Sequence, residues 1–164
     1  MGWLTKHQRE LRAKVLRDAE WLVAHQLIEG YSEARPYARP PFPPRYPFSS
    51  DCSGTLKLLF EWAGIPSPDQ EPWGFGNTAT LVNAPGSYHV PLSQRQWQPL
   101  DYVFYKRHSG PFIGGPGEHV VMLHHRDDHG NWVAISHGRS AGPEWVNPFY
   151  RQVEAVRRYR LPRR

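Results

Sequence analysis

Cys52 is the only cysteine in the 164-residue chain, and it stands in the run SSDCSG (49–54) directly before an apolar, helix-like stretch. At the start of a helix, unpaired backbone N–H groups and the positive end of the helix dipole favour a thiolate. A single cysteine can form neither an intramolecular disulfide nor a cysteine-rich zinc site. Cys52 is therefore either an inert buried residue, as free cysteines often are, or a nucleophile.

A cysteine nucleophile needs a base, and usually a third group that orients the base. Two of the nine histidines, His119 and His137, flank a predicted hairpin. A turn centred on residue 128 would place them directly opposite each other, with Cβ atoms roughly 4.5–5.5 Å apart. A loop with an odd number of residues, such as 127–129, keeps this pairing. A loop with an even number sends one ring to the other face of the sheet, unless a β-bulge corrects the register.

A metal site is the alternative use of the histidines. His124, His125, Asp127 and His129 crowd at the tip of the predicted hairpin, but they follow no recognised ligand spacing. Thiol chemistry requires no metal and no cofactor, and we expect neither.

The first elements along the chain are a long helix and a loop. Apolar residues recur at helical spacing over residues 3–29 and predict one helix that stops at Gly30. Residues 31–48 contain six prolines, which oppose a helix or a central strand and predict an ordered loop wrapped on the body. A proline-rich recognition ligand is the alternative. The apolar positions of the helix are Leu4, Leu11, Val15, Ala19, Leu22, Val23 and Leu27.

The remaining elements must position the cysteine and the histidines. A second helix is predicted over 52–63, with Ser50 or Asp51 as its cap. Residues 66–99 are rich in Pro, Gly, Asn and Gln and predict a long connection with little regular structure. Helices followed by an antiparallel sheet make an α+β layout. Four strands are predicted, at 101–105, 119–124, 132–137 and 153–161, with a turn at 127–130.

Length and composition fit one folded domain over residues 1–164. No apolar run approaches the ~20 residues of a membrane helix, and the N-terminus lacks the apolar core of a signal peptide. We therefore expect a protein made in the cytoplasm that needs a separate route if it acts outside a cell. No zinc-finger or RNP-type motif indicates specific binding to nucleic acid.

The whole chain carries a formal net charge of +5, and arginines concentrate in its last segment. A basic end suits an anionic partner such as nucleic acid, a membrane surface or a cell-wall polymer, although it can also serve only solubility. The arginines expected to bind an anionic wall polymer are Arg157, Arg158, Arg160, Arg163 and Arg164.

Four segments resemble, in order, the motifs of one family. The run Asp51-Cys52-Ser53-Gly54 ahead of a helix resembles the nucleophile motif of the NlpC-type papain-like peptidases, which cut peptide stems in bacterial cell walls. Residues 98–105 (QPLDYVFY) resemble the family's "LxPGDLVFF" strand, and residues 118–123 (EHVVML) resemble its "xHVGIYL" strand. Residues 134–138 (AISHG) resemble the "xxIHA" segment that follows.

The resemblance implies Cys52 as the nucleophile, His119 as the general base and His137 as the orienting third residue. It implies that backbone N–H groups around Cys52, from Asp51 to Ser53, stabilise the oxyanion. It also implies a papain-like core, in which a small antiparallel sheet packs on the helix that carries the cysteine. The layout would be an N-terminal helix (1–30), a proline-rich loop (31–48) and a catalytic core with a basic C-terminal strand and tail (49–164).

The chain departs from the family pattern at three places. Leu100 and Val121 stand where glycine is common. An upstream tyrosine of the family usually precedes a glycine pair, which is absent here. Tyr37 is the nearest match by context and the expected substrate-binding residue, and Tyr46 is a rival.

The expected function is hydrolysis of amide bonds in the peptide stems of peptidoglycan by a monomeric cysteine peptidase. Without a signal peptide, such an enzyme is most simply a phage endolysin that reaches the wall after its release, with a virion-associated enzyme or an effector toxin as alternatives. Three other functions stay open: a CHAP-like N-acetylmuramoyl-L-alanine amidase, an acyltransferase on the same scaffold, and a non-catalytic basic binding protein in which Cys52 is structural.

Overall fold

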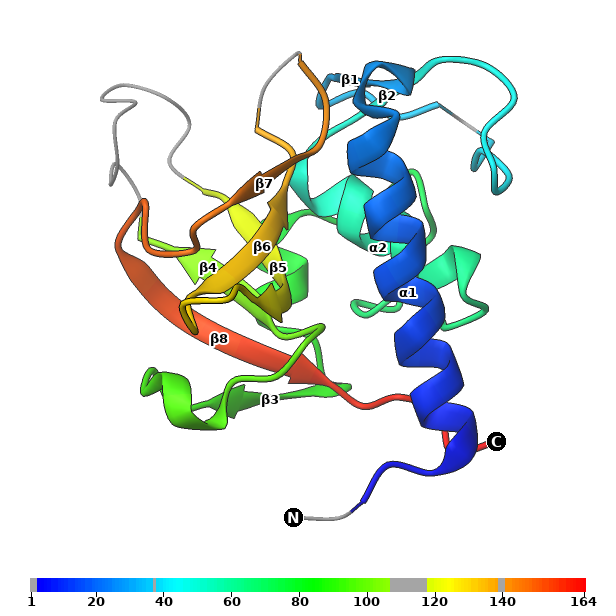
Figure 1. Ribbon diagram of the computed structural model, residues 1–164. Coiled ribbons are helices and arrows are strands. Elements are labelled where there is room, and N and C mark those ends of the chain that lie inside the picture. The colour runs from blue at the N-terminus through cyan, green and yellow to red at the C-terminus, as the bar shows by residue number, and fades with distance from the viewer. Residues whose placement is uncertain (1–2, 37, 107–117, 139–140) are drawn as a thin grey trace.

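The chain forms an antiparallel sheet whose one face packs against two long helices (Figure 1). The computed structural model describes residues 3–36, 38–106, 118–138 and 141–164. The helices are α1 (Lys6–Ala24), α2 (Cys52–Trp62) and α3 (Thr78–Val82), with the short 3-10 turns η1 (Gln26–Ile28) and η2 (Gln94–Gln96). The strands are β1 (Glu29–Tyr31), β2 (Phe48–Ser50), β3 (Ser87–Val90), β4 (Tyr102–Tyr105), β5 (Val120–Arg126), β6 (Trp132–Ser136), β7 (Glu144–Val146) and β8 (Val153–Tyr159).

Six of the strands make one antiparallel sheet in the order β3-β8-β4-β5-β6-β7, while β1 and β2 form a separate parallel pair. The predicted α+β class is confirmed. The pair β1–β2 lies beside the C-terminal end of α1, and the C-terminus of the chain lies near the N-terminal end of α1 (Figure 1). No helix among the described residues is both long and apolar enough to cross a membrane.

Helix α2 lies at the centre of the protein. Every residue from Cys52 to Phe60 is buried, so this helix has no solvent face in its first nine residues. Leu56, Leu59 and Phe60 meet Val120 and Met122 on one sheet face. Helix α1 covers the same core with Val15, Ala19 and Leu22. A helix that is buried on every side needs partners on every side, and here the sheet and α1 supply the apolar ones.

The predicted boundaries are close for the central elements and wrong for the first helix. The predicted helix 52–63 and the four predicted strands match α2, β4, β5, β6 and β8. Helix α1, however, ends at Ala24 rather than at 29, because the His25 ring bonds the Trp21 carbonyl and residues 29–31 pair with β2. Leu27, expected on the buried face, is 85% exposed. The expected loop 66–99 contains α3, β3 and η2, which the sequence did not predict.

A buried ion pair fixes the segment that follows α2. Lys57 Nζ lies 3.1 Å from the Asp69 carboxylate, and both side chains are fully buried. Nζ also donates to the carbonyls of Pro72 and Phe75, while Asp69 accepts from Thr80 Oγ1. These bonds hold residues 69–80 against α2.

Asp69→Ala should lower the free energy of unfolding by about 3–5 kcal/mol, because it leaves a buried ammonium without its carboxylate. The double variant Lys57→Met/Asp69→Leu removes both charges and should lose less. Chemical denaturation followed by tryptophan fluorescence measures both. An equal loss in the single and double variants would contradict this account.

Candidate active site

Cys52 is the first residue of α2 and lies beside the start of β5. It is 6% exposed and packs in the same cluster as Val120. Its sulfur hydrogen bonds to the backbone of Val120 and of Ser53 and lies 3.7 Å from Thr78 Oγ1. The helix start therefore presents the thiol at the strand end that carries His119.

The Asp51 carboxylate organises the first turn of α2. Asp51 is the N-cap, and its Oδ1 accepts from the Gly54 N–H at 2.7 Å, which satisfies an otherwise free helix donor. Arg35 donates to the same oxygen at 3.0 Å and to Ser53 Oγ at 2.7 Å. Arg35 approaches so closely that a Cβ at Gly54 would lie 2.7 Å from its Nε. The glycine of the SSDCSG run therefore makes room for this arginine.

Cys52 opens onto a cleft of about 340 Å³. The far wall comes from residues 74–78, which Lys57 and Asp69 hold in place. Gly76 is required there, because its φ is +78° and a Cβ would lie 2.2 Å from Asp69 Oδ2. The lining residues are Tyr31, Glu33, Arg35, Asp51, Cys52, Ser53, Gly74, Gly76, Asn77, Thr78 and Glu118.

The expected direct opposition of His119 and His137 is wrong. Near the turn, Arg126 pairs with Trp132, which would have kept both rings on one face of the sheet. A β-bulge at His124 then shifts the register, so that Leu123 pairs with Ala134 and Met122 with Ile135. Continued to the strand ends, this register places His119 across from Gly138, and the two rings project to opposite faces. A Cβ at Gly138 would indeed lie 3.3 Å from His119 Cε1.

His119 is oriented by Ser136 rather than by His137. Its Nε2 lies 2.9 Å from Ser136 Oγ, and Tyr150 hydrogen bonds to the same serine. The ring stacks on Tyr105 with centroids 5.9 Å apart. Burial, followed by the positive charge of Arg151, lowers the pKa of His119 to about 4. At neutral pH the imidazole is therefore uncharged and competent to accept a proton.

His137 lies on the helix face of the sheet in a buried polar cluster. Its Nδ1 is 2.8 Å from Thr55 Oγ1, which also donates to Glu29 Oε1 at 2.9 Å. Tyr31 meets the ring edge-on at 5.5 Å. Burial lowers the pKa of His137 to about 4 and raises that of Glu29 to about 7. Within the described chain, His137 Nε2 and Glu29 Oε2 are buried without hydrogen-bond partners.

The thiol is not activated at rest, contrary to the expectation from its helix-start position. Burial raises the pKa of Cys52, and the neighbouring Asp51 carboxylate raises it further. The bonds to Thr78, Val120 and Ser53 act in the opposite direction but are outweighed. Neither imidazole hydrogen bonds to Sγ among the residues that the structure describes.

The other predicted site residues divide into three groups. Asp51 and Ser53 line the cleft, but their side chains are engaged by Arg35. Tyr37 lies outside the described residues, and Tyr46 is 79% exposed and away from the cleft lining. The tyrosine of the cleft is Tyr31, which sequence reasoning missed. It also missed Ser136, Thr55 and Glu29, whose positions depend on register and on β1 pairing rather than on a motif.

The structure leaves only some of the five C-terminal arginines available to bind an anionic polymer. Arg157 is buried and donates to Ser87 Oγ and to the Ala84 carbonyl, so it is unavailable to a partner. Arg158 makes a two-point ion pair with Asp101. Arg160, Arg163 and Arg164 are exposed.

The histidines and Asp127 at the hairpin tip do not converge on a common point, as a metal site would require. Asp127 accepts from the backbone N–H groups of His129 and Asn131 and so shapes the turn. His124 turns inward and bonds the Leu16 carbonyl. In the described part of the chain, no three His, Cys, Asp or Glu side chains are arranged to hold a metal ion.

Comparison with known proteins found no match among protein-family models, curated proteins or solved structures. The chemistry of the site therefore rests on the geometry above.

Alkylation of Cys52 by iodoacetamide should be slow near pH 7 and should still be rising at pH 9, because burial raises the thiol pKa. The same protein unfolded in urea is the matched reference and should react faster throughout this range. A rate for the folded protein that levels off at or below pH 7 would instead show a preformed thiolate–imidazolium pair.

Glu29→Gln should change how stability depends on pH. A carboxyl whose pKa is raised on folding keeps its proton in the folded protein and loses it on unfolding in this pH range. The contribution of Glu29 to the free energy of unfolding of the wild type therefore decreases as pH rises from 4.5 to 7. The two histidines act oppositely between pH 4 and 6.5, because unfolding lets them take up protons.

Removing only the Glu29 contribution should make the variant gain stability relative to wild type, by up to about 1.4 kcal/mol per pH unit across that window. Urea denaturation at pH 4.5 to 8 measures the difference. Parallel curves for the two proteins would refute a raised pKa at Glu29. Glutamine is the appropriate replacement because it has the shape of the neutral acid.

Proposed function

We propose that the chain is a cysteine peptidase that hydrolyses amide bonds in the peptide stems of bacterial peptidoglycan. The main support for this proposal is the position of Cys52. It lies at the start of the buried helix α2, opens onto a cleft and contacts the backbone of Val120, next to His119. A buried helix packed on an antiparallel sheet is also what a papain-like core of the NlpC type requires. A phage endolysin, acting on the wall after its release, is the simplest biological role for such an enzyme.

The backbone at Leu100 supports this assignment. Leu100 occupies a position where the family commonly has glycine, and its φ is +76°, in the left-handed region that favours glycine. The chain keeps the conformation although the residue differs. In return, the Leu100 side chain is buried in the core.

His119 is the general base of the proposed reaction. Ser136 engages its Nε2, so Nδ1 is the nitrogen left to accept the thiol proton, although no hydrogen bond joins it to Sγ at rest among the described residues. Because both groups are neutral at rest, proton transfer accompanies attack on the carbonyl instead of preceding it. The imidazolium then protonates the leaving amine, and water releases the acyl-enzyme. Ser136, with Tyr150 behind it, takes the orienting role expected of His137.

The first turn of α2 supplies the donors for the oxyanion. Asp51 already occupies the N–H groups of Gly54 and Thr55 through its side chain and carbonyl. The Cys52 N–H has no intrahelical acceptor and lies next to the nucleophile, whereas the Ser53 N–H already contacts the sulfur. A donor of this kind is worth ~3–4 kcal/mol of transition-state stabilisation in well-studied hydrolases.

One observation favours the competing, non-catalytic function. Cys52 is almost fully buried and its thiol pKa is raised, as in a structural cysteine. The cleft beside it and the neutral histidine at β5 favour the peptidase.

Cys52→Ala should abolish the release of fragments from purified peptidoglycan while the protein stays folded, and retained cleavage would reject the proposal. His119→Ala should reduce the rate by ~10²–10⁴-fold, as expected for loss of a general base. Ser136→Ala should have a smaller effect, mainly on kcat. His129→Ala, at the exposed hairpin tip, is the matched control and should keep full activity.

Mass spectrometry of the fragments identifies the bond. A peptidase leaves part of the stem on the sugar, whereas an amidase frees the whole stem. Addition of a chelator should leave the rate unchanged, because the thiol reaction needs no metal.

A further inference from the structure

A second hollow lies at the opposite end of α1 from the Cys52 cleft, between the start of α1, β3 and the C-terminal segment. We call it the basic groove. It has a volume of about 540 Å³, and none of the described residues that line it is acidic. Its chemistry comes from four arginines and two aromatic residues, namely Arg12, Arg158, Arg160, Arg163, Trp3 and Tyr88.

Three of the four guanidinium groups have no carboxylate within ion-pair distance among the described residues. Arg158 forms an ion pair with the buried Asp101, whose charge also acts on Arg12 from beyond ion-pair distance. Arg12 donates to Gln98 through one Nη, but its Nε is buried without an acceptor. Burial and then the charge of Arg158 lower the pKa of Arg12, and the Asp101 carboxylate offsets only part of this lowering. An anion in the groove would relieve this repulsion.

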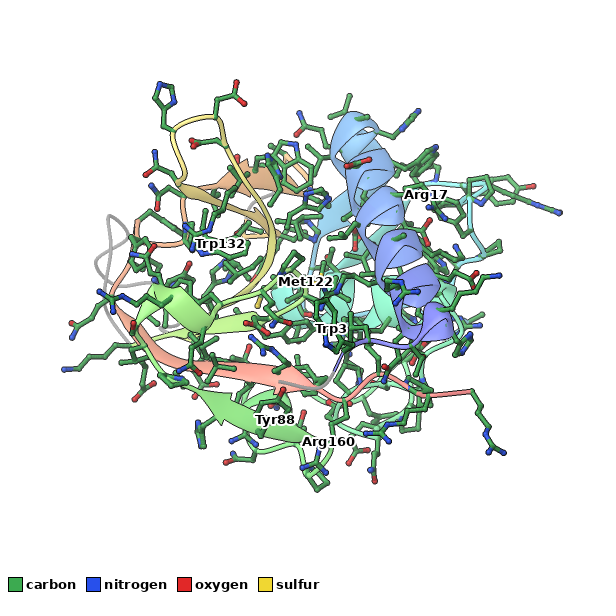
Figure 2. All side chains as sticks on the ribbon, turned by 60° about the horizontal axis from the view of Figure 1, so that its bottom comes forward. Trp3, Arg17, Tyr88, Met122, Trp132 and Arg160 are labelled. Atoms are coloured by element: carbon green, nitrogen blue, oxygen red, sulfur yellow. The ribbon has the colours of Figure 1, made fainter. Side chains whose placement is uncertain are left out.

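Aromatic faces lie among these charges. Tyr88 is 42% exposed, and the guanidinium groups of Arg158 and Arg160 each lie 5.9 Å from its ring centroid. Tyr88 and Arg160 lie close together at the end of the β3–β8 ladder (Figure 2). Trp3 is 98% exposed at the groove. Such rings offer an apolar surface to the carbon skeleton of a sugar or polyol.

We propose that the basic groove binds a phosphate-bearing polyol or glycan polymer of the cell wall. Guanidinium groups match phosphate oxygens in a two-point geometry, and the aromatic faces suit the units between phosphates. The groove is compact, whereas a single-stranded nucleic acid needs a longer basic track with successive stacking platforms. The choice of a wall polymer rests on the proposed function, while the anion chemistry of the groove does not.

The linings of the basic groove and of the Cys52 cleft carry opposite charges. The Cys52 cleft is lined by Glu33, Asp51 and Glu118 against one arginine, Arg35, so an anionic polymer is repelled there. A chain held in the basic groove therefore leaves the cleft open to peptide stems. The groove is a tether, and the cleft is the reaction site.

The test measures binding of poly(glycerol phosphate) to the full chain by calorimetry at several salt concentrations. The double variant Arg160→Glu/Arg163→Glu should bind at least tenfold more weakly, and its salt dependence should fall by about one unit of slope per lost contact. The control Arg17→Glu/Arg45→Glu changes the net charge equally at exposed sites outside the groove and should lose less than threefold.

Two further probes decide the ligand class. A single-stranded oligonucleotide with the same number of phosphates should bind more weakly than poly(glycerol phosphate), and inorganic phosphate should bind more weakly still. Tighter binding of the oligonucleotide would assign the groove to nucleic acid, and equal binding of inorganic phosphate would reduce it to a single-anion site. Equal losses in both double variants, or no binding by the wild type, would reject the groove.

These experiments can reject the proposed ligand of the groove and the proposed peptidase activity independently of each other. Binding is measured without turnover, so its outcome does not depend on Cys52. The Arg160→Glu/Arg163→Glu variant should cleave soluble stem fragments at the wild-type rate, because neither arginine lines the cleft. A loss of that cleavage would contradict the separation of tether and reaction site.

Discussion

The burial of the first turn of α2 is the constraint on which the site depends. In a buried helix start, the N–H groups that do not face the cleft, here those of Gly54 and Thr55, need protein acceptors. Asp51 supplies them, and its charge then requires Arg35, which reaches across to the carbonyls of Trp73, Phe75 and Gly76. The cap, the arginine and the cleft wall are therefore one bonded unit. Lys57 and Asp69 anchor the other end of the same wall one and a half turns further along the helix.

The same burial keeps the Cys52 thiol and the imidazoles of His119 and His137 uncharged. A helix start stabilises an anion by ~0.3–1 kcal/mol at exposed sites, which is modest beside the desolvation of a buried thiol. Asp51 adds a negative charge next to the sulfur. The two imidazoles are likewise held neutral by burial. The resting site thus holds no thiolate–imidazolium pair, and in the proposed reaction negative charge develops only when the thiol attacks a carbonyl near the first-turn N–H groups.

The sequence predicted what local pattern controls. The apolar run after Cys52, the cap at Asp51 and the runs of β-branched, aromatic and other apolar residues in β4, β5 and β6 could be recognised in the sequence, because each depends on neighbours in the chain. The end of α1 was not, since pairing of residues 29–31 with β2 overrides helical spacing. The short elements between 66 and 99 depend on tertiary partners such as Asp69 and Arg157. The basic tail was visible as composition, but its division into buried and exposed arginines was not.

The pairing of the histidines shows why a site can be found in the sequence while its geometry cannot. The hairpin loop has odd length, so the simple register rule keeps His119 and His137 on one face. His124 breaks the rule. Its ring turns inward to bond the Leu16 carbonyl of α1 and to pack on Trp145, and the strand accommodates this extra residue as a bulge. One register step then exchanges the neighbours of both catalytic candidates: Ser136 reaches His119, and His137 turns to Thr55 and Glu29 on the helix side. A contact with α1, more than a hundred residues earlier in the chain, thus determines which side chain bonds the His119 imidazole.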